Sequence, residues 1–306
     1  MPSSRKPPPT ASSQKPRAGK RAEVIAQLKR DQARQRRRSR LMLAAAVVAA
    51  VVILGVVFVV VGLNRPTGKS QATTSAGNGV VAGVTQVPGA TFDAVGAGSI
   101  AAGPKGIKGT ALTEAGKPRV LYIGAEYCPY CAAERWPVTA ALSRFGTFSN
   151  LGQTASSASD IFPNTPTLSF HGATYSSKYL AFTGVETTSN QPQGSGYAPL
   201  DTPSAADEKT FQTYDFPPYV SSGGSIPFVD VGGQYVQSGA SYDPGLLKGM
   251  THQQVVRAMQ TPNSAVAQAV DGSANIFTAA LCRLTHDQPA NVCSSAGVTA
   301  AAAKLG

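Results

Sequence analysis

The chain has 306 residues, which is enough for one domain with attached segments or for two small domains. Its 27 basic residues outnumber its 16 acidic ones, but residues 1–40 alone carry 13 Lys and Arg against two acids. The remaining residues carry 14 basic and 14 acidic groups, a balance that excludes the strongly basic surface of a nucleic-acid-binding domain.

An uncharged apolar segment, Leu41–Leu63, follows the basic tail directly. As a helix its 23 residues would extend about 35 Å, enough to cross a hydrocarbon core of about 30 Å. Basic residues stay on the cytoplasmic side, so we predict a cytoplasmic tail at 1–40 and a single transmembrane helix at 41–63 in the cell membrane of a bacterium. The alternative is a cleaved signal peptide, whose charged and apolar parts are usually shorter.

The residues after the apolar segment predict a linker and then one extracytoplasmic domain. Residues 64–79 are rich in Gly, Ser and Thr, as in a flexible linker, and the domain is expected to span 80–306. An insertion rich in Gly, Pro, Gln and Ser is expected around 187–224.

The patterns along the domain predict short elements of both kinds. In chain order we expect β-capable pieces at 84–87 and 91–95, a strand at 119–124, a helix at 132–145, a hairpin from 168–170 and 180–182, a helix at 204–214, a strand–Gly turn–strand unit at 225–237, a helix at 252–260 opened by a Thr251/Gln254 capping box, and a helix at 274–284.

A C-x-x-C motif, Cys128-Pro129-Tyr130-Cys131, stands between the predicted strand and helix. A cysteine at a helix N-terminus has its thiolate stabilised by unpaired N–H groups and by the helix dipole. The second cysteine lies one turn further on, where it can attack a mixed disulfide. The motif therefore predicts thiol–disulfide chemistry, with Cys128 as the attacking thiolate and Cys131 as the resolving thiol.

The order of the elements resembles the thioredoxin-like superfamily. Residues 125–131 (AEYCPYC) are similar to the active-site segment of thioredoxins, and Ile226-Pro227 resembles their cis-proline step. Residues 123–149 and the anchored layout also resemble uncharacterised bacterial membrane proteins catalogued as a domain of unknown function. The resemblance implies an α/β domain, a central mixed sheet flanked by helices, after one transmembrane helix.

The resemblance also implies roles for single residues. Pro227 would be cis, and Ile226 would hold a substrate chain. Tyr130 is a candidate for shaping a peptide groove because it flanks the cysteines, and not because of the resemblance. Thioredoxins bury an acid six residues before the first cysteine, where Tyr122 stands here, so a proton relay would be absent or supplied by Glu126. Glu126 is otherwise a solvated charge, with a candidate role in setting the pKa of Cys128.

Two other readings of the cysteines stay open. A C-x-x-C can be half of a zinc site, but no further pair of ligands stands at metal spacing. Cys282 and Cys293 fit a structural disulfide in an oxidising compartment, with a second redox pair as the alternative.

The expected function is a membrane-anchored thiol–disulfide oxidoreductase acting on protein thiols or disulfides and recycled by a membrane redox partner, with no metal or organic cofactor indicated. The alternative is a thioredoxin-fold peptide clamp or scaffold without turnover.

Overall fold

The computed structural model describes residues 70–221 and 223–305. The predicted cytoplasmic tail, the transmembrane helix and the first part of the predicted linker lie outside these ranges. Within the described ranges, no helix is both long and apolar enough to cross a membrane.

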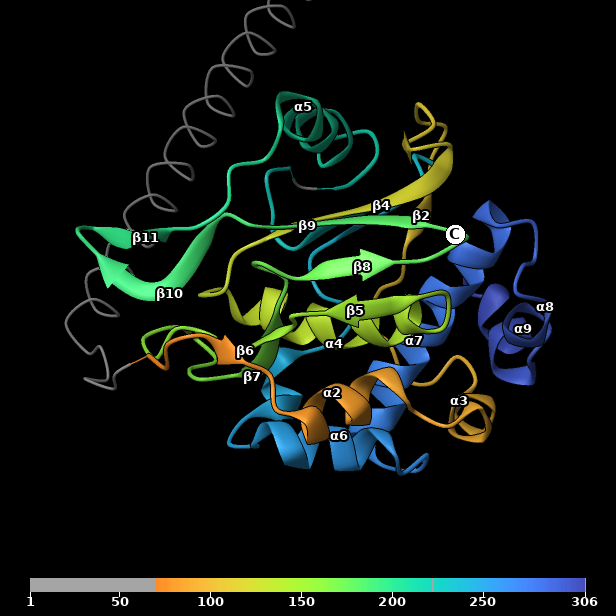
Figure 1. The fold of residues 1–306 in the computed structure, drawn as a ribbon, viewed down its shortest axis with the longest axis horizontal. Helices are drawn as coiled ribbons and strands as arrows, with labels where there is room; N and C mark the ends of the chain where they lie inside the picture. Colours follow the sequence, from red (N-terminus) through yellow and green to blue (C-terminus); the bar gives the residue numbers. More distant parts are fainter. Residues whose placement is uncertain (1–69, 222, 306) are drawn as a thin grey trace, which may run out of the picture. The chain divides into compact units, whose positions relative to one another are not determined.

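A six-stranded mixed sheet forms the centre of the described domain (Figure 1). Its path runs β2-β13-β12-β4-β3, and β9 pairs with β4 in addition. Strand β4 is antiparallel to β12 and parallel to β9. The bounds are β2 Lys105–Gly106, β3 Thr113–Glu114, β4 Lys117–Gly124, β9 Ala181–Glu186, β12 Phe228–Val231 and β13 Tyr235–Ser238.

Strand β4 is apolar throughout its second half because both faces of the sheet are covered. Alternate side chains of a strand point to opposite faces. Val120 and Tyr122 belong to the larger core cluster, whereas Leu121 and Ile123 belong to a second cluster on the other face. These four side chains are at most 3% exposed. Strand β4 thus has a neighbouring strand on each edge and a hydrophobic cluster on each face. Its end at Gly124 is therefore firmly placed, and the turn that leads to Cys128 starts there.

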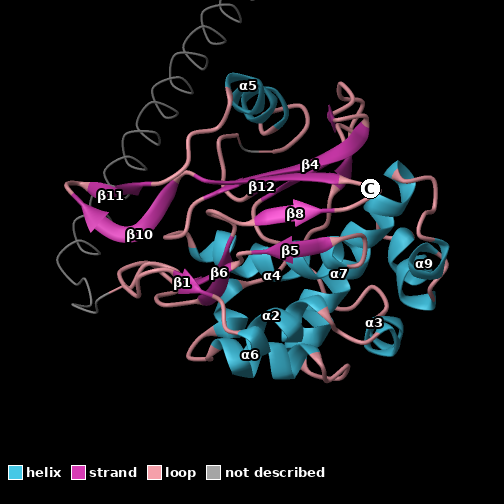
Figure 2. Cartoon of the chain, viewed as in Figure 1, coloured by secondary structure: helices cyan, strands magenta, loops and turns pink. Residues whose placement is uncertain are grey.

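Helices cover both faces of the sheet (Figures 1 and 2). On one face, helices α4 and α7 pack against each other and contribute side chains to the larger core cluster. On the other face, α5 covers the second cluster, where the rings of Phe211 and Phe228 meet edge to face with their centroids 5.4 Å apart. The helix bounds are α2 Asn78–Thr85, α3 Gly89–Val95, α4 Pro129–Ser143, α5 Ala205–Tyr214, α6 His252–Met259, α7 Ala265–Leu284, α8 Ala290–Cys293 and α9 Ala296–Ala302, and a short 3-10 helix, η1, spans Pro244–Leu247.

Three small sheets complete the domain. They are a three-stranded sheet β1-β6-β7 and the pairs β5-β8 and β10-β11. Their bounds are β1 Thr74–Ser75, β5 Thr147–Ser149, β6 Gly152–Ala155, β7 Pro166–Ser169, β8 Thr174–Ser176, β10 Thr188–Gln193 and β11 Gly196–Pro199.

Helix α4 contains a proline, and the carbonyl that this proline leaves free is bound from outside the helix. Pro137 has no N–H to donate to the carbonyl of Ala133, four residues earlier. The Tyr242 hydroxyl donates to that carbonyl instead, at 2.7 Å. The Thr167 hydroxyl donates to the neighbouring carbonyl of Ala132 at 2.8 Å. Side chains from two other segments therefore support the first turns of α4.

Several predicted elements are present. The strand before the C-x-x-C motif, the helix after it, the β12–β13 unit and the helix at 205–214 all form, and α6 has the predicted capping box. The predicted last helix starts nine residues earlier, at Ala265, where Ser264 caps it.

Other predictions were wrong. The pieces at 84–87 and 91–95 do not form strands, because α2 and α3 cover most of them, and α2 packs on α6. The expected 168–182 hairpin does not form, since β7 pairs with β6 and β9 with β4. Residues 70–79 of the predicted linker contain β1 and the start of α2. The insertion predicted around 187–224 contains the predicted helix, α5, together with the hairpin β10–β11, which the sequence did not predict.

Cys282 and Cys293 form a disulfide, with their Cα atoms 5.6 Å apart. The bond joins the last turn of α7 to the end of α8. Because both sulfur atoms are in this disulfide, Cys282 and Cys293 cannot serve as zinc ligands together with the C-x-x-C motif.

Candidate functional site

Cys128 lies at the N-cap of α4, directly after the turn that follows β4. Its Sγ accepts a hydrogen bond from the backbone N–H of Cys131 at 3.4 Å. The Cys128 side chain is 6% exposed and Cys131 is fully buried, and neither is in a disulfide. The geometry gives one thiol access to the surface and keeps the other beneath it.

The two thiols have pKa values that move in opposite directions. The hydrogen bond from the Cys131 thiol, assisted by the N–H of Cys131 and by Arg135, lowers the pKa of Cys128 against the opposing effect of burial. Burial, followed by the interaction with Cys128, raises the pKa of Cys131 well above its usual value. The first thiolate to form is therefore on Cys128, because the helix donors and Arg135 favour a negative charge there.

The loop before β12 faces Cys128. The register between β12 and β4 pairs Phe228 with Ile123, which brings the preceding Ile226-Pro227 step beside the end of β4. The Ile226–Pro227 peptide bond is cis. The Cys128 thiol points at the carbonyl oxygen of Ile226, with Sγ and O 3.8 Å apart. The backbone edge predicted to hold a substrate chain thus lies next to the predicted nucleophile.

Apolar side chains stand exposed around Cys128. Tyr130 is 42% exposed and meets the half-buried Phe162 edge to face at 6.0 Å. Ile161, adjacent in the chain, is 71% exposed. Exposed apolar groups in one place often mark a contact surface, so Tyr130 remains a candidate for contacts with a substrate.

The insertion reaches the cysteine turn through β11. Tyr127 stacks on Tyr197 of β11, with ring centroids 4.4 Å apart and planes 5° apart. The backbone N–H of Glu126 donates to the carbonyl of Thr188 in β10. Burial, with a smaller contribution from Cys128, raises the pKa of Tyr127 to about 12, so its hydroxyl is neutral at physiological pH. The hairpin β10–β11 therefore packs directly against the turn that leads to Cys128.

Glu126 is not a solvated charge. It is 1% exposed, and its two carboxylate oxygens accept hydrogen bonds from Ser169 Oγ at 2.6 Å and Thr73 Oγ1 at 2.7 Å. These hydroxyls fix the carboxylate between β7 and the segment before β1. The charge that acts on Cys128 comes instead from Arg135.

Arg135 and Glu186 form a fully buried ion pair beneath the cysteines, and the sequence prediction missed it. Arg135 Nε and Nη2 donate to the two oxygens of Glu186 at 2.7 and 2.6 Å. Nη2 also donates to the carbonyl of Ala125 at 2.7 Å. The available signals were two adjacent charged residues, Glu134 and Arg135, in a mostly apolar helix, and an acid at the end of β9.

Tyr122 is fully buried, and its hydroxyl has no hydrogen-bond partner among the described residues. Burial raises the pKa of Tyr122 well above its ordinary value. A Cβ added at Gly124 would collide with the Tyr122 hydroxyl, so the tyrosine runs under the end of β4. Tyr122 therefore supplies no carboxylate at the position where thioredoxins bury an acid.

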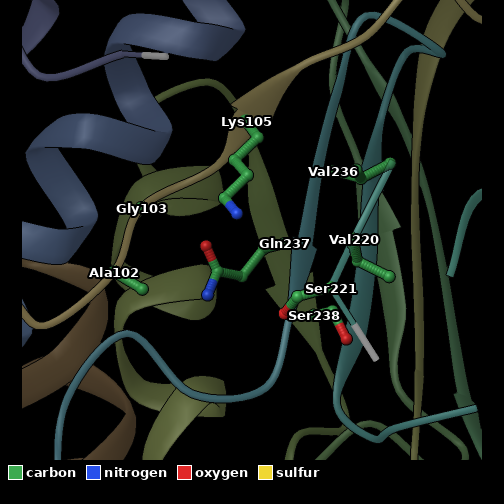
Figure 3. A pocket seen from close by; sticks show the side chains of 8 residues that line it. All are labelled: Ala102, Gly103, Lys105, Val220, Ser221, Val236, Gln237 and Ser238. Carbon is green, nitrogen blue, oxygen red and sulfur yellow. The ribbon is translucent and has the colours of Figure 1, made fainter. Parts of the chain in front are cut away.

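Two cavities of the described domain lie away from the cysteines. One of about 180 Å³ opens beside β2 and β13, between Lys105, Gln237 and Ser238 (Figure 3). Another of about 400 Å³ lies beside Met250 and His252. Neither of these two cavities is lined by Cys128, Cys131 or the Ile226-Pro227 step.

The comparison with known protein families gives one match. A family model described as Domain of unknown function (DUF929) matches residues 105–195 and 200–283, more than half of the chain. The chain belongs to this family. No curated protein and no solved structure matches the chain.

Proposed function

We propose that the chain is a thiol–disulfide oxidoreductase with a thioredoxin-like outer domain anchored in the cell membrane. The observation that carries the proposal is Cys128 at the N-cap of α4, with Cys131 N–H at 3.4 Å and the Ile226 carbonyl at 3.8 Å from its Sγ. This arrangement gives a thiol with a lowered pKa, 6% exposed, beside a backbone edge.

In the reducing direction, the Cys128 thiolate attacks one sulfur of a substrate disulfide. The S–S bond of the substrate breaks, and its second sulfur leaves as a thiolate and takes a proton. Cys131 then loses its proton and attacks Cys128 Sγ, which releases the first substrate sulfur. Two electrons pass to the substrate and Cys128–Cys131 becomes a disulfide. The oxidising direction is the reverse of these steps.

The proposal includes partners on both sides of the reaction. Protein thiols or disulfides are the proposed substrates, because the exposed Tyr130, two residues after Cys128, offers an apolar contact to a polypeptide. A redox partner in the membrane would restore the Cys128–Cys131 pair after each turnover. The basic tail and the apolar segment 41–63 support a cytoplasmic N-terminus and an extracytoplasmic domain.

A peptide clamp or scaffold without turnover is the second candidate. It is favoured by the complete burial of Cys131 and by Tyr122 in place of a buried acid, both of which slow proton loss from the resolving thiol.

Trapping of mixed disulfides separates the two candidates. Cys131→Ser in the full chain should accumulate disulfide-linked complexes with substrate proteins through Cys128, because no thiol remains to resolve them. Cys128→Ser should accumulate few or none, and the Cys282→Ala/Cys293→Ala chain is the control for chance disulfides. If neither single variant traps a protein and the unchanged chain reduces no disulfide, the clamp replaces the oxidoreductase.

A further inference from the structure

One charged group near the cysteines has no part in the exchange as written. Arg135 lies one helical turn after Cys131 on α4, and residues four apart share a helix face. It is fully buried, and so is its partner Glu186 at the end of β9. An ion pair taken wholly out of water has a large desolvation penalty, so its presence beneath a reactive thiol needs an explanation.

Arg135 fixes the backbone that leads into Cys128. Its Nη2 donates to the carbonyl oxygen of Ala125 at 2.7 Å, and the same oxygen accepts the N–H of Cys128 at 3.2 Å. Glu186 holds the guanidinium through two parallel hydrogen bonds, a geometry that fixes its plane. A chain of contacts therefore runs from β9 through Arg135 to the turn that presents the nucleophile.

The guanidinium also keeps one nitrogen unpaired. Nη1 is buried and has no partner among the described residues, and it lies on the side of the guanidinium away from Glu186. The guanidinium carbon is 5.8 Å from the centre of the Tyr122 ring, whose hydroxyl is also unpaired. A buried donor without an acceptor is unfavourable, and negative charge formed nearby relieves it.

We propose, on the basis of the function proposed above, that the Arg135–Glu186 pair is a positioning and charge-balancing device that sets the stability of the Cys128 thiolate. Arg135 acts as the counter-charge when the thiolate forms, and Glu186 limits that effect by neutralising part of the guanidinium charge. Replacing Arg135 should thus lower the fraction of Cys128 that is thiolate, and replacing Glu186 should raise it.

The other titratable groups around the Arg135–Glu186 pair do not supply the positive charge that stabilises the Cys128 thiolate. Burial raises the pKa of Tyr122 on β4 and of Tyr127 in the turn, so both are neutral at physiological pH. Cys131 on α4 has a raised pKa, chiefly through burial. Glu126 is held by hydroxyls of Ser169 and Thr73 and is unchanged in the variants below.

The test measures alkylation of Cys128 against pH in the reduced full chain. Arg135→Met should slow alkylation at pH 7 by roughly tenfold, because the thiolate loses a nearby positive charge. Glu186→Gln should speed it, because the guanidinium is no longer neutralised. Arg135→Lys, which keeps the charge, should stay nearer to the unchanged chain than Arg135→Met does.

Arg119→Met is the matched control. Arg119 lies at the other end of β4 and pairs with Asp207 at 2.6 Å, with the two side chains 12% and 7% exposed. This variant breaks a second, partly buried ion pair of the same fold but should leave the alkylation profile of Cys128 unchanged. An effect of general destabilisation would appear in Arg119→Met as well.

Opposite shifts in Arg135→Met and Glu186→Gln support the proposal, whereas shifts of one sign, or none, overturn it. If Arg135→Met fails to fold, the decision rests on faster alkylation in Glu186→Gln, with Arg135→Lys close to the unchanged chain. Failure of the proposed function is a separate result: the unchanged chain would then show the alkylation profile of an ordinary thiol and no disulfide exchange.

Discussion

The chain contains two cysteine pairs, and they lie at opposite ends of helices. Cys128 is the N-cap of α4, and its pair with Cys131 is reduced. Cys282 is in the last turn of α7 and is joined to Cys293 in a disulfide. At a helix N-terminus, unpaired N–H groups and the positive end of the dipole favour a thiolate, and at a C-terminus the dipole opposes it. The same side chain is thus suited to attack at one place and to a lasting cross-link at the other.

The largest expected effect concerns which pair performs exchange. Cys128→Ala should reduce the rate of disulfide exchange by several orders of magnitude, because no other described thiol combines access with a lowered pKa. Cys282→Ala/Cys293→Ala should leave the rate close to that of the unchanged chain. Reduction of a small chromogenic disulfide gives both rates, and loss of exchange in the double variant would make the second pair a redox relay.

Stability should show the reverse pattern. Removing the Cys282–Cys293 bond frees a short loop in the unfolded chain and should lower the free energy of unfolding by about 3 kcal/mol. Urea unfolding followed by the fluorescence of the single tryptophan, the buried Trp136, measures this in the full chain. Cys128→Ser should change stability less, and a larger loss there would contradict the assigned roles.

The pH dependence separates the pairs further. The folded state lowers the pKa of Cys128, so its thiolate persists at pH values where an unfolded thiol, with a pKa of about 8.5, is protonated. At Cys128 the folded state therefore binds fewer protons than the unfolded state in this window, so the contribution of Cys128 to stability, measured as the difference between the unchanged chain and Cys128→Ser, should rise with pH up to about 8.5. Cys128→Ser should remove that rise, and the disulfide variant should keep it. A rise retained by Cys128→Ser would assign it to another group.

The smallest effect is expected at Tyr130. Tyr130→Ala removes an exposed ring and one edge-to-face contact with Phe162, so stability should fall by less than about 1 kcal/mol. Exchange with a protein disulfide should slow a few-fold while exchange with a small disulfide stays constant. Equal slowing of both reactions would place Tyr130 in the turn geometry and not in contact with substrate.

Local patterns were sufficient for the elements that carry the cysteines. An apolar run gives β4, the residues after Cys128 give α4, and Thr251 with Gln254 gives the start of α6. They failed where packing decides, as at α2, whose Val84 was predicted in a β-capable piece but is a buried helix residue in contact with the rest of the core.

The ion pair could not be derived from the sequence for a similar reason. Arg135 and Glu186 are 51 positions apart, and only the parallel pairing of β9 with β4 brings them together. Glu126 was read as solvated because carboxylates are rarely buried, yet its hydroxyl partners come from segments 43 and 53 residues away.

The hydroxyl of Tyr242 makes the first part of α4 depend on tertiary packing in a way that an unbroken helix does not. A backbone N–H donor belongs to the helix itself, whereas Tyr242 belongs to the loop after β13. Because Tyr242 is buried, the carbonyl of Ala133, two residues after Cys131, keeps this donor only while that loop stays packed against α4. The loop after β13 is by this contact a direct neighbour of the cysteine turn.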